Sequence, residues 1–300
     1  MPTRRTIVGL GEILWDVFPD GPHFGGAPAN FACSAAELGG NELDVYIVGS
    51  VGRDELGGRA VELLQAHGVN TSCVSFAGQP TGQVLVTLDE AGRASFEIAI
   101  DTAWDNITWS DELQRLAARA DAVCFGTLGQ RSPTSRETIQ RFVRSTRPEC
   151  LRILDINLRP PFWDEAILRQ SFELANVLKL NDTELVVLAE MLGWQGTDDE
   201  LLEKLLRTFS LRLVALTRGA EGATLISAVG EHSDLPGQPV AVVDTVGAGD
   251  SYTAALAVGL LNRIPLAAIN AWGIRVAAFV CSQPGATPHL PAGLRSALLG

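Results

Sequence analysis

The chain has 300 residues, of which 46% are hydrophobic and 19% charged. This composition is typical of one ordered globular body with a generous core, and it excludes a disordered chain. The formal net charge of −12 repels nucleic acid and anionic membranes, so we expect neither as a partner. No apolar run reaches the roughly 18 residues of a membrane span, and the N-terminal stretch turns polar too soon for a signal peptide. These features predict a cytoplasmic protein.

Cysteine and histidine usage argues against disulfides and against a transition-metal site. The five cysteines are odd in number and widely scattered, a pattern that does not fit a disulfide framework. None of the four histidines is spaced as a metal-ligand pair. We therefore expect free thiols and no zinc.

Short aliphatic runs alternate with helix-length amphipathic stretches along most of the chain. This rhythm predicts an α/β fold, a three-layer sandwich with a central, mostly parallel sheet and crossover helices. The expected strands are Thr6–Leu10, Val45–Val48, Ala122–Phe125, Leu151–Ile156, Val177–Leu180 and Leu213–Leu216. The expected helices are Ala29–Leu38, Gly57–Ala66, Asp111–Arg119, Ser135–Thr146, Asp182–Leu192, Asp199–Phe209, Ser251–Leu261 and Leu266–Cys281.

One segment interrupts the alternation. Gly82–Leu88 and Ala94–Ile100 are strand-like runs joined by the turn-rich connector Asp89–Arg93, which predicts a β-hairpin. Joined by residues Glu12–Pro19, the hairpin could form a small sheet over the mouth of a site. Such a lid would exclude water from reactive chemistry.

The most informative motif is Asp244-Thr-Val-Gly-Ala-Gly-Asp-Ser251. We expect it to lie between a strand that ends near Val243 and a helix that begins near Ser251. Glycines there allow backbone N–H groups to converge on an anion. A carboxylate beside such a cradle, Asp250, suits the removal of a proton from an attacking hydroxyl, which indicates phosphoryl transfer. The alternative is a tight turn in which Asp250 only caps the helix.

A second glycine-containing motif is Phe24-Gly-Gly-Ala-Pro-Ala-Asn30. Paired glycines permit close approach of a ligand, and Asn30 can both donate and accept hydrogen bonds, as sugar hydroxyls require. Asp16, just upstream, could hold further hydroxyls. Ordinary turn chemistry explains these residues equally well.

Two further motifs follow neighbouring expected strands. Asp155-Ile-Asn-Leu-Arg-Pro-Pro161 carries Arg159, which could bind substrate or developing phosphate charge. Lys179-Leu-Asn-Asp-Thr-Glu184 places Asn181 and Glu184 three residues apart at a helix start. That pair could orient water around magnesium and phosphate, or it could form a capping box.

A last motif, Thr217-Arg-Gly-Ala-Glu-Gly-Ala223, again follows an expected strand and could receive the nucleotide. All four strand-end motifs fall where an open α/β sheet builds its crevice. We therefore expect them to gather into one site.

Together these motifs resemble the ribokinase-like, or PfkB, family of carbohydrate and nucleoside kinases, and within it the fructokinases. The resemblance covers nearly the whole chain and is most specific in the last of six segments: Gly25–Asn30, Val48–Gly58, Asp155–Trp163, Asn181–Glu184, Thr217–Gly222 and Asp244–Ser251. It implies a single ribokinase-like domain over residues 1–300 with a β lid from about 12–24 and 79–103. It also implies ATP as phosphoryl donor and a small sugar, fructose or a related ketose or hexose, as acceptor.

The resemblance also implies residue roles. An anion hole would form at Gly247, Ala248, Gly249 and Asp250, with Asp250 as catalytic base. The sugar would contact Asp16, Gly26, Asn30 and Arg159, and ATP would contact Lys179, Asn181, Thr217, Gly219 and Gly222. Glu184 would support Mg²⁺ through water, and Asp244, Val246 and Gly285 would contribute to a monovalent cation site, with K⁺ as the candidate ion.

Several alternatives stay open. Kinases of the same fold that act on 2-keto-3-deoxygluconate, ribose or nucleosides compete with a fructokinase, as does a catalytically silent sugar sensor. A dinucleotide-binding dehydrogenase is disfavoured because Gly9-Leu10-Gly11 lacks the third glycine and is followed by Glu12. A Walker-type NTPase is excluded because no Gly-Lys-Ser/Thr occurs. An apolar face on the lid could pair two copies into a homodimer.

Overall fold

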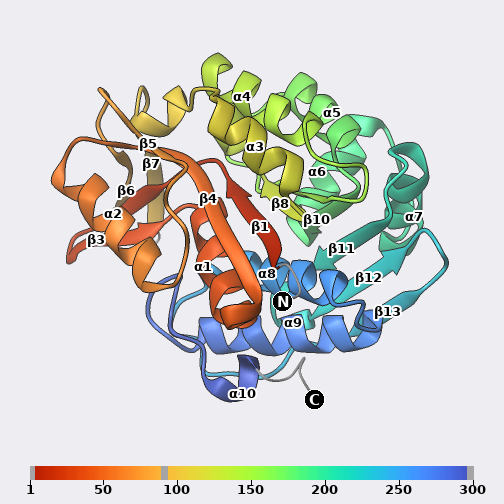
Figure 1. Cartoon of the computed structure of the whole chain (residues 1–300). Coiled ribbons are helices and arrows are strands. Elements are labelled where there is room, and N and C mark those ends of the chain that lie inside the picture. The colour runs from red at the N-terminus through yellow and green to blue at the C-terminus, as the bar shows by residue number, and fades with distance from the viewer. Residues whose placement is uncertain (1–3, 89–93, 296–300) are drawn as a thin grey trace.

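The computed structural model describes residues 4–88 and 94–295 and has the predicted α/β architecture (Figure 1). In these residues a nine-stranded sheet, the main sheet, has the strand order β13-β12-β11-β10-β9-β8-β1-β4-β5. All neighbours from β11 to β5 pair in parallel, and β12 and β13 extend the sheet by antiparallel pairing. The main-sheet strands are β1 (Arg5–Leu10), β4 (Leu43–Gly52), β5 (Val74–Ala77), β8 (Ala122–Phe125), β9 (Leu151–Asp155), β10 (Val177–Asn181), β11 (Leu213–Thr217), β12 (Ala223–Ser227) and β13 (His232–Leu235).

Helices cover both faces of the main sheet because its central strands are apolar on both faces. In β1, Ile7 packs into the core on one face and Val8 into the core on the other, and both are fully buried. The first core is closed by α1 (Ala27–Gly39), α2 (Glu55–Ala66), α8 (Ala248–Leu261) and α9 (Leu266–Cys281), with α10 (Ala292–Arg295) beside α1 and α9. The second is closed by α3 (Asp111–Arg119), α4 (Pro133–Arg144), α5 (Glu165–Leu174), α6 (Asp182–Leu192) and α7 (Asp198–Thr208).

A smaller sheet lies at one end of the molecule (Figure 1). Over the described part of the chain it has four strands in the order β3-β2-β6-β7, which are β2 (Leu14–Phe18), β3 (Gly21–Gly25), β6 (Gly82–Leu88) and β7 (Ala94–Ile98). The predicted hairpin is confirmed as the antiparallel pair β6–β7. Strand β2 pairs in parallel with β6 and so extends the hairpin into a sheet. The predicted connector Asp89–Arg93 lies outside the described residues.

One expected strand is wrong. No strand ends near Val243, because β13 ends at Leu235 and residues 236–247 form a loop. Proline at 236 and at 239 removes two backbone donors that a sheet would need, and Val243 remains 62% exposed. The loop is instead anchored on α9, since the N–H groups of Val243 and Asp244 donate to the carbonyl of Cys281 at 2.8 and 3.2 Å.

Short 3-10 helices occupy Gly40–Glu42, Ala103–Asn106, Leu128–Gln130 and Gly219–Glu221. Among residues 4–88 and 94–295, every helix is too short or too polar to span a bilayer.

Candidate active site

A cavity of about 590 Å³ opens at the carboxyl ends of the central strands, between the small sheet and the first turns of α1 and α8. This is the edge where open α/β sheets bind ligands. The cavity brings together most of the residues predicted from sequence: Asp16, Gly26, Asn30, Arg159, Lys179, Asn181, Glu184, Val246, Gly247, Gly249 and Asp250. As expected from their places at strand ends, these residues from distant motifs line one cavity.

Asp250 lies in the first turn of α8, where its half-buried side chain borders the cavity. Its Oδ2 accepts a hydrogen bond of 2.8 Å from the side-chain amide of Asn30 on α1. Burial raises the pKa of Asp250 to about 6, and the nearby Asp155 carboxylate adds to the rise, while Asn30, Lys179 and Arg159 oppose it. The carboxylate is thus mostly ionised at neutral pH and ready to accept a proton.

The alternative in which Asp250 caps the helix is wrong, because Gly247 is the N-cap of α8. Gly247 has a φ of +78°, and a Cβ there would meet the carbonyl of Ala286 at 2.3 Å, so only glycine fits this turn. The helix therefore begins three residues before the predicted Ser251. Gly249 and Asp250 of its first turn line the cavity, and the N-terminus of a helix stabilises an anion. Ala248 does not line the cavity, and its N–H points back to the carbonyl of Thr245 at 3.4 Å.

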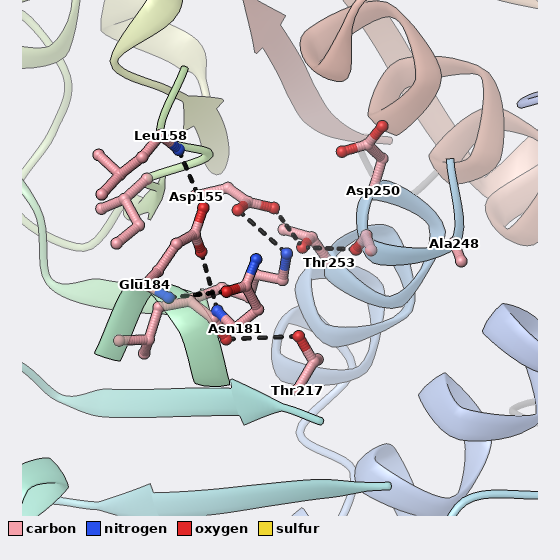
Figure 2. Close-up of polar contacts among 12 residues, drawn as sticks. Asp155, Leu158, Asn181, Glu184, Thr217, Ala248, Asp250 and Thr253 are labelled. Atoms are coloured by element: carbon pink, nitrogen blue, oxygen red, sulfur yellow. Dashed lines mark hydrogen bonds and ion pairs between the residues drawn. The ribbon is translucent and has the colours of Figure 1, made fainter. Parts of the chain in front are cut away.

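A buried ion pair crosses the floor of the cavity. Nζ of Lys179, on β10, lies 3.1 Å from Asp155 Oδ1 at the end of β9, and Asp155 Oδ2 accepts a 2.9 Å hydrogen bond from Thr253 on α8. Burial disfavours the Lys179 ammonium, but the surrounding carboxylates outweigh it and raise the pKa of Lys179. Figure 2 shows Asp155 facing the turns of α8 that carry Asp250 and Thr253.

Asn181 and Glu184 form the capping box that sequence left as one of two alternatives. Asn181 accepts from the Glu184 N–H at 2.8 Å, and Glu184 accepts from the Asn181 N–H at 2.8 Å (Figure 2). The other oxygen of Glu184 accepts from the N–H of Leu158 at 2.9 Å, which ties the Arg159 loop to α6. Burial raises the pKa of Glu184. The carboxylate still lines the cavity, so capping and support of a metal-bound water are compatible.

Three residues predicted to contact ATP lie at the next strand end, beside the cavity and not in its wall. Thr217 is the register partner of Asn181 between β10 and β11, and its hydroxyl donates to the carbonyl of Leu180 at 3.3 Å. Gly219 and Gly222 bracket the turn after β11, which packs on residues 235–237.

The residues predicted for a monovalent cation also come together. The Asp244 carboxylate accepts hydrogen bonds from the N–H groups of Val246 at 3.0 Å and Gly285 at 3.2 Å. This links the loop before α8 to the segment after α9, so the position of the Gly247 turn depends on both.

Sequence reasoning missed Glu12, Asp155 and Asn157 as site residues. Glu12 follows the end of β1 and is 3% exposed, and burial raises its pKa to about 7. Its Oε2 and the Oδ1 of Asn30 are buried polar atoms without a hydrogen-bond partner among the described residues. The signal that could have found Glu12 and Asp155 is their place at carboxyl ends of parallel strands.

Asp16, on β2, completes the acidic side of the cavity. Burial raises its pKa to about 6, opposed by Arg159 and helped by Asp244. Four carboxylates thus line the cavity, those of Glu12, Asp16, Glu184 and Asp250, together with two cationic side chains, Arg159 and Lys179. A fifth carboxylate, that of Asp155, lies beneath the cavity and pairs with Lys179. A polar ligand and a counter-cation suit this balance.

The fold and this cavity are those of a phosphotransferase that acts on small molecules. The chain belongs to the PfkB family of carbohydrate kinases, whose sequence model matches residues 21–293. A fructokinase of Salmonella typhimurium is 31% identical over 270 residues, covering 85% of each chain. Fructokinase-1 of Zea mays is 30% identical over 273 residues, covering 84% of this chain and 82% of that protein.

Solved structures agree on the fold. An uncharacterised sugar kinase of Pyrococcus horikoshii in complex with ATP superposes with a TM-score of 0.77 at 28% identity, covering 94% of this chain and 93% of that one. A fructokinase of Xylella fastidiosa with bound ATP has a TM-score of 0.84 at 22% identity, covering 99% and 98%. The ribokinase-like fold and the sugar kinase class predicted from sequence are confirmed.

Proposed function

We propose that this sugar kinase transfers the γ-phosphoryl group of ATP to a hydroxyl of fructose or a closely related ketose or hexose, with Asp250 as catalytic base. The observation that carries the proposal is the position of Asp250: it is half-buried in the first turn of α8, held by a hydrogen bond from Asn30, and borders the cavity beside the helix N-terminus. A base must lie next to the phosphate cradle, because the hydroxyl that loses its proton is the one that attacks the phosphorus.

On the sugar side, Asp16, Gly26, Asn30 and Arg159 form the wall next to the small sheet. The unpartnered Glu12 Oε2 and Asn30 Oδ1 support a ligand with several hydroxyl donors, because buried polar atoms are normally hydrogen-bonded. Asn30 would then accept from the sugar through Oδ1 while its amide holds the base. The fructokinase relatives favour fructose, and the structure of a Vibrio cholerae fructokinase at 24% identity holds fructose, ADP and a calcium ion.

On the nucleotide side, the anion hole of Gly247, Gly249 and Asp250 would hold the transferring phosphoryl group, with Ala248 shaping the turn. Lys179, Asn181, Thr217, Gly219 and Gly222 would contact ATP along the ends of β10 and β11. Lys179 supports this assignment because it is charged and reaches the cavity.

A divalent metal fits the donor set, since the acidic cavity alone would repel the phosphates of ATP. Glu184 would hold Mg²⁺ through water, and the metal would neutralise phosphate charge. A monovalent cation near Asp244, Val246 and Gly285 stays a proposal of the same kind, with K⁺ as the ion to test.

We further propose that residues 1–300 act as one domain whose small sheet serves as a lid. Leu14, Phe18, Val84, Phe96 and Ile98 of this sheet border the cavity, so its movement would admit the sugar and then exclude water.

The opposite side of the small sheet exposes Leu85 at 47%, and pairing with the lid of a second copy would cover it. Light scattering that gives a monomer mass for both the parent and Leu85→Glu would contradict the homodimer.

The experiment that tests the function is ATP consumption by the purified protein with Mg²⁺, across fructose, ribose, 2-keto-3-deoxygluconate and adenosine, with and without K⁺. Turnover that depends on fructose and is lost in Asp250→Asn supports the proposal. Turnover that depends on another of these acceptors would leave Asp250 as the proposed base and assign a different substrate. Saturable sugar binding without ATP turnover overturns the assignment and favours the sensor.

A further inference from the structure

The ends of α1 and α2 meet the segment before α10 at a cluster of metal-ligating side chains outside the active site. Glu37 lies near the end of α1, His67 follows α2, and His289 precedes α10. One ligand atom from each of the three lies within 4.8 Å of the others. Because His67 and His289 are 30 and 252 residues from Glu37 in sequence, no local spacing could have revealed the cluster.

One carboxylate oxygen organises the cluster. Glu37 Oε1 lies 2.7 Å from Nδ1 of His289 and 3.3 Å from Nδ1 of His67. Two imidazoles and one carboxylate are a donor set that Zn²⁺ accepts, with bonds of about 2.0–2.2 Å and tetrahedral geometry. Tetrahedral bonds of that length put neighbouring ligand atoms about 3.3–3.6 Å apart. The 3.3 Å separation of Glu37 Oε1 and His67 Nδ1 already matches this spacing. The 2.7 Å separation of Oε1 and His289 Nδ1 is a hydrogen-bond length, and it would widen when a metal replaces the proton.

The second carboxylate oxygen is oriented by a cation. Arg295 Nη2 lies 2.5 Å from Glu37 Oε2, and Arg295 Nε donates to the carbonyl of Leu290 at 2.7 Å. Outer-shell partners of this kind fix the direction of a metal-ligating carboxylate. Arg295 therefore leaves Oε1 directed at the histidines while it occupies the other oxygen.

Two of the three side chains in the cluster are buried, which distinguishes it from a chance grouping of surface residues. The side chains of Glu37 and His67 are 8% and 7% exposed, whereas His289 is 69% exposed. The cluster also borders a polar cavity of about 580 Å³, lined in part by Glu37, His67 and Arg295, which leaves room for a fourth ligand.

We propose that Glu37, His67 and His289 form a binding site for one zinc-class divalent transition-metal ion, with water from the adjacent cavity as the fourth ligand. The ion joins α1, α2 and the C-terminal segment. α1 also carries Asn30 at its other end, and the C-terminal segment carries Gly285, which bonds Asp244. The site is distinct from the Mg²⁺ that accompanies ATP, and its ligands do not line the catalytic cavity.

The test uses the full chain, freed of metal by a chelator and then titrated with Zn²⁺ or Co²⁺. Metal content after dialysis gives the stoichiometry, and the visible spectrum of Co²⁺ reports its coordination number. We compare the parent with His289→Gln and His67→Gln. The matched control is His232→Gln, since His232 is also exposed and lies 3.7 Å from a carboxylate, that of Asp199, but has no second histidine beside it.

The expected result is one equivalent of metal in the parent and in His232→Gln, with the intense visible bands of four-coordinate Co²⁺, and loss of that equivalent in the other two variants. His289→Gln is the decisive variant because an exposed side chain can be changed without loss of fold, which circular dichroism verifies. Unchanged binding in His289→Gln overturns the site. So does the absence of saturable binding by the parent, or a thiolate-to-cobalt charge-transfer band, which would assign the metal to a cysteine.

Discussion

The side-chain amide of Asn30 donates a 2.8 Å hydrogen bond to Oδ2 of Asp250, although 220 residues separate the two in sequence. The bond joins the first turn of α1 to the first turn of α8 and stabilises the ionised form of a carboxylate whose burial works against ionisation. Asn30, which is predicted to bind the sugar, thus also stabilises the ionised form of Asp250, the predicted base.

Asn30→Ala should raise the pKa of Asp250 further, because the hydrogen bond is one of the interactions that lower it. Loss of a hydrogen bond to a charged group costs about 1.5–3 kcal/mol, so kcat/KM for the sugar should fall by about 10-fold to 100-fold. The acid limb of the pH profile should move upward. In an Asp250→Asn background the same change should cost far less, and equal costs in both backgrounds would contradict the coupling.

Asp250→Asn should lower turnover by about 10²-fold to 10⁴-fold, the usual contribution of a general base. The measurement is steady-state ATP consumption with saturating sugar. Asp111→Asn is the matched control, since Asp111 is an exposed aspartate in the first turn of α3 and its charge contributes only to the helix dipole. Comparable turnover in the two variants would remove Asp250 from the mechanism.

The activity of the parent should decline as the pH falls through about 6, because a base with its pKa raised to about 6 is protonated below that pH. Asp16 has a similar pKa, so kcat/KM of Asp16→Asn distinguishes the two. The acid limb should persist in Asp16→Asn despite weaker sugar binding. Its disappearance there would assign the titration to Asp16.

Gly249→Ala should impair ATP turnover, because a Cβ at this position would lie 2.9 Å from Nζ of Lys179. The lysine must move, and a displacement of about 1 Å at a reacting site can cost on the order of 10²-fold. The control is Gly58→Ala on α2, where a Cβ meets no atom within 4 Å. That change should leave activity intact and stabilise the helix by up to about 1 kcal/mol. Parent-like kinetics for Gly249→Ala would argue against a close phosphate cradle.

Glu12→Gln should stabilise the protein at alkaline pH. Folding raises the pKa of Glu12 from 4.5 to about 7, so the folded state binds the proton more tightly, and the resulting cost to stability is absent below pH 4.5 and complete above pH 7. Between pH 5.5 and 8.5 the advantage of the variant in the free energy of unfolding should grow by about 2 kcal/mol.

Urea unfolding of both proteins at the two pH values measures this difference. A difference in the free energy of unfolding that does not change with pH would mean that the ionised Glu12 side chain does not destabilise the folded protein. Reduced sugar phosphorylation by Glu12→Gln, alongside the higher stability, would show that the buried charge serves function.

The amino-acid sequence by itself determined the α/β class, the hairpin and the glycine turn before α8, because these depend on local periodicity and local backbone conformation. It also determined which strand ends carry polar motifs. It misjudged the loop at residues 236–247, since the apolar run before Asp244 has the pattern of a strand but lies on the surface.

The tertiary structure alone decided which of these groups touch. Asn30 with Asp250, and Lys179 with Asp155 and Thr253, are contacts between elements far apart in the chain. The raised pKa values of Glu12, Asp16 and Asp250 arise from burial, which no local pattern fixes. The cluster of Glu37, His67 and His289 has the same origin: its spacing in sequence carries no metal motif, and only the packing of α1, α2 and the C-terminal segment brings its ligands together.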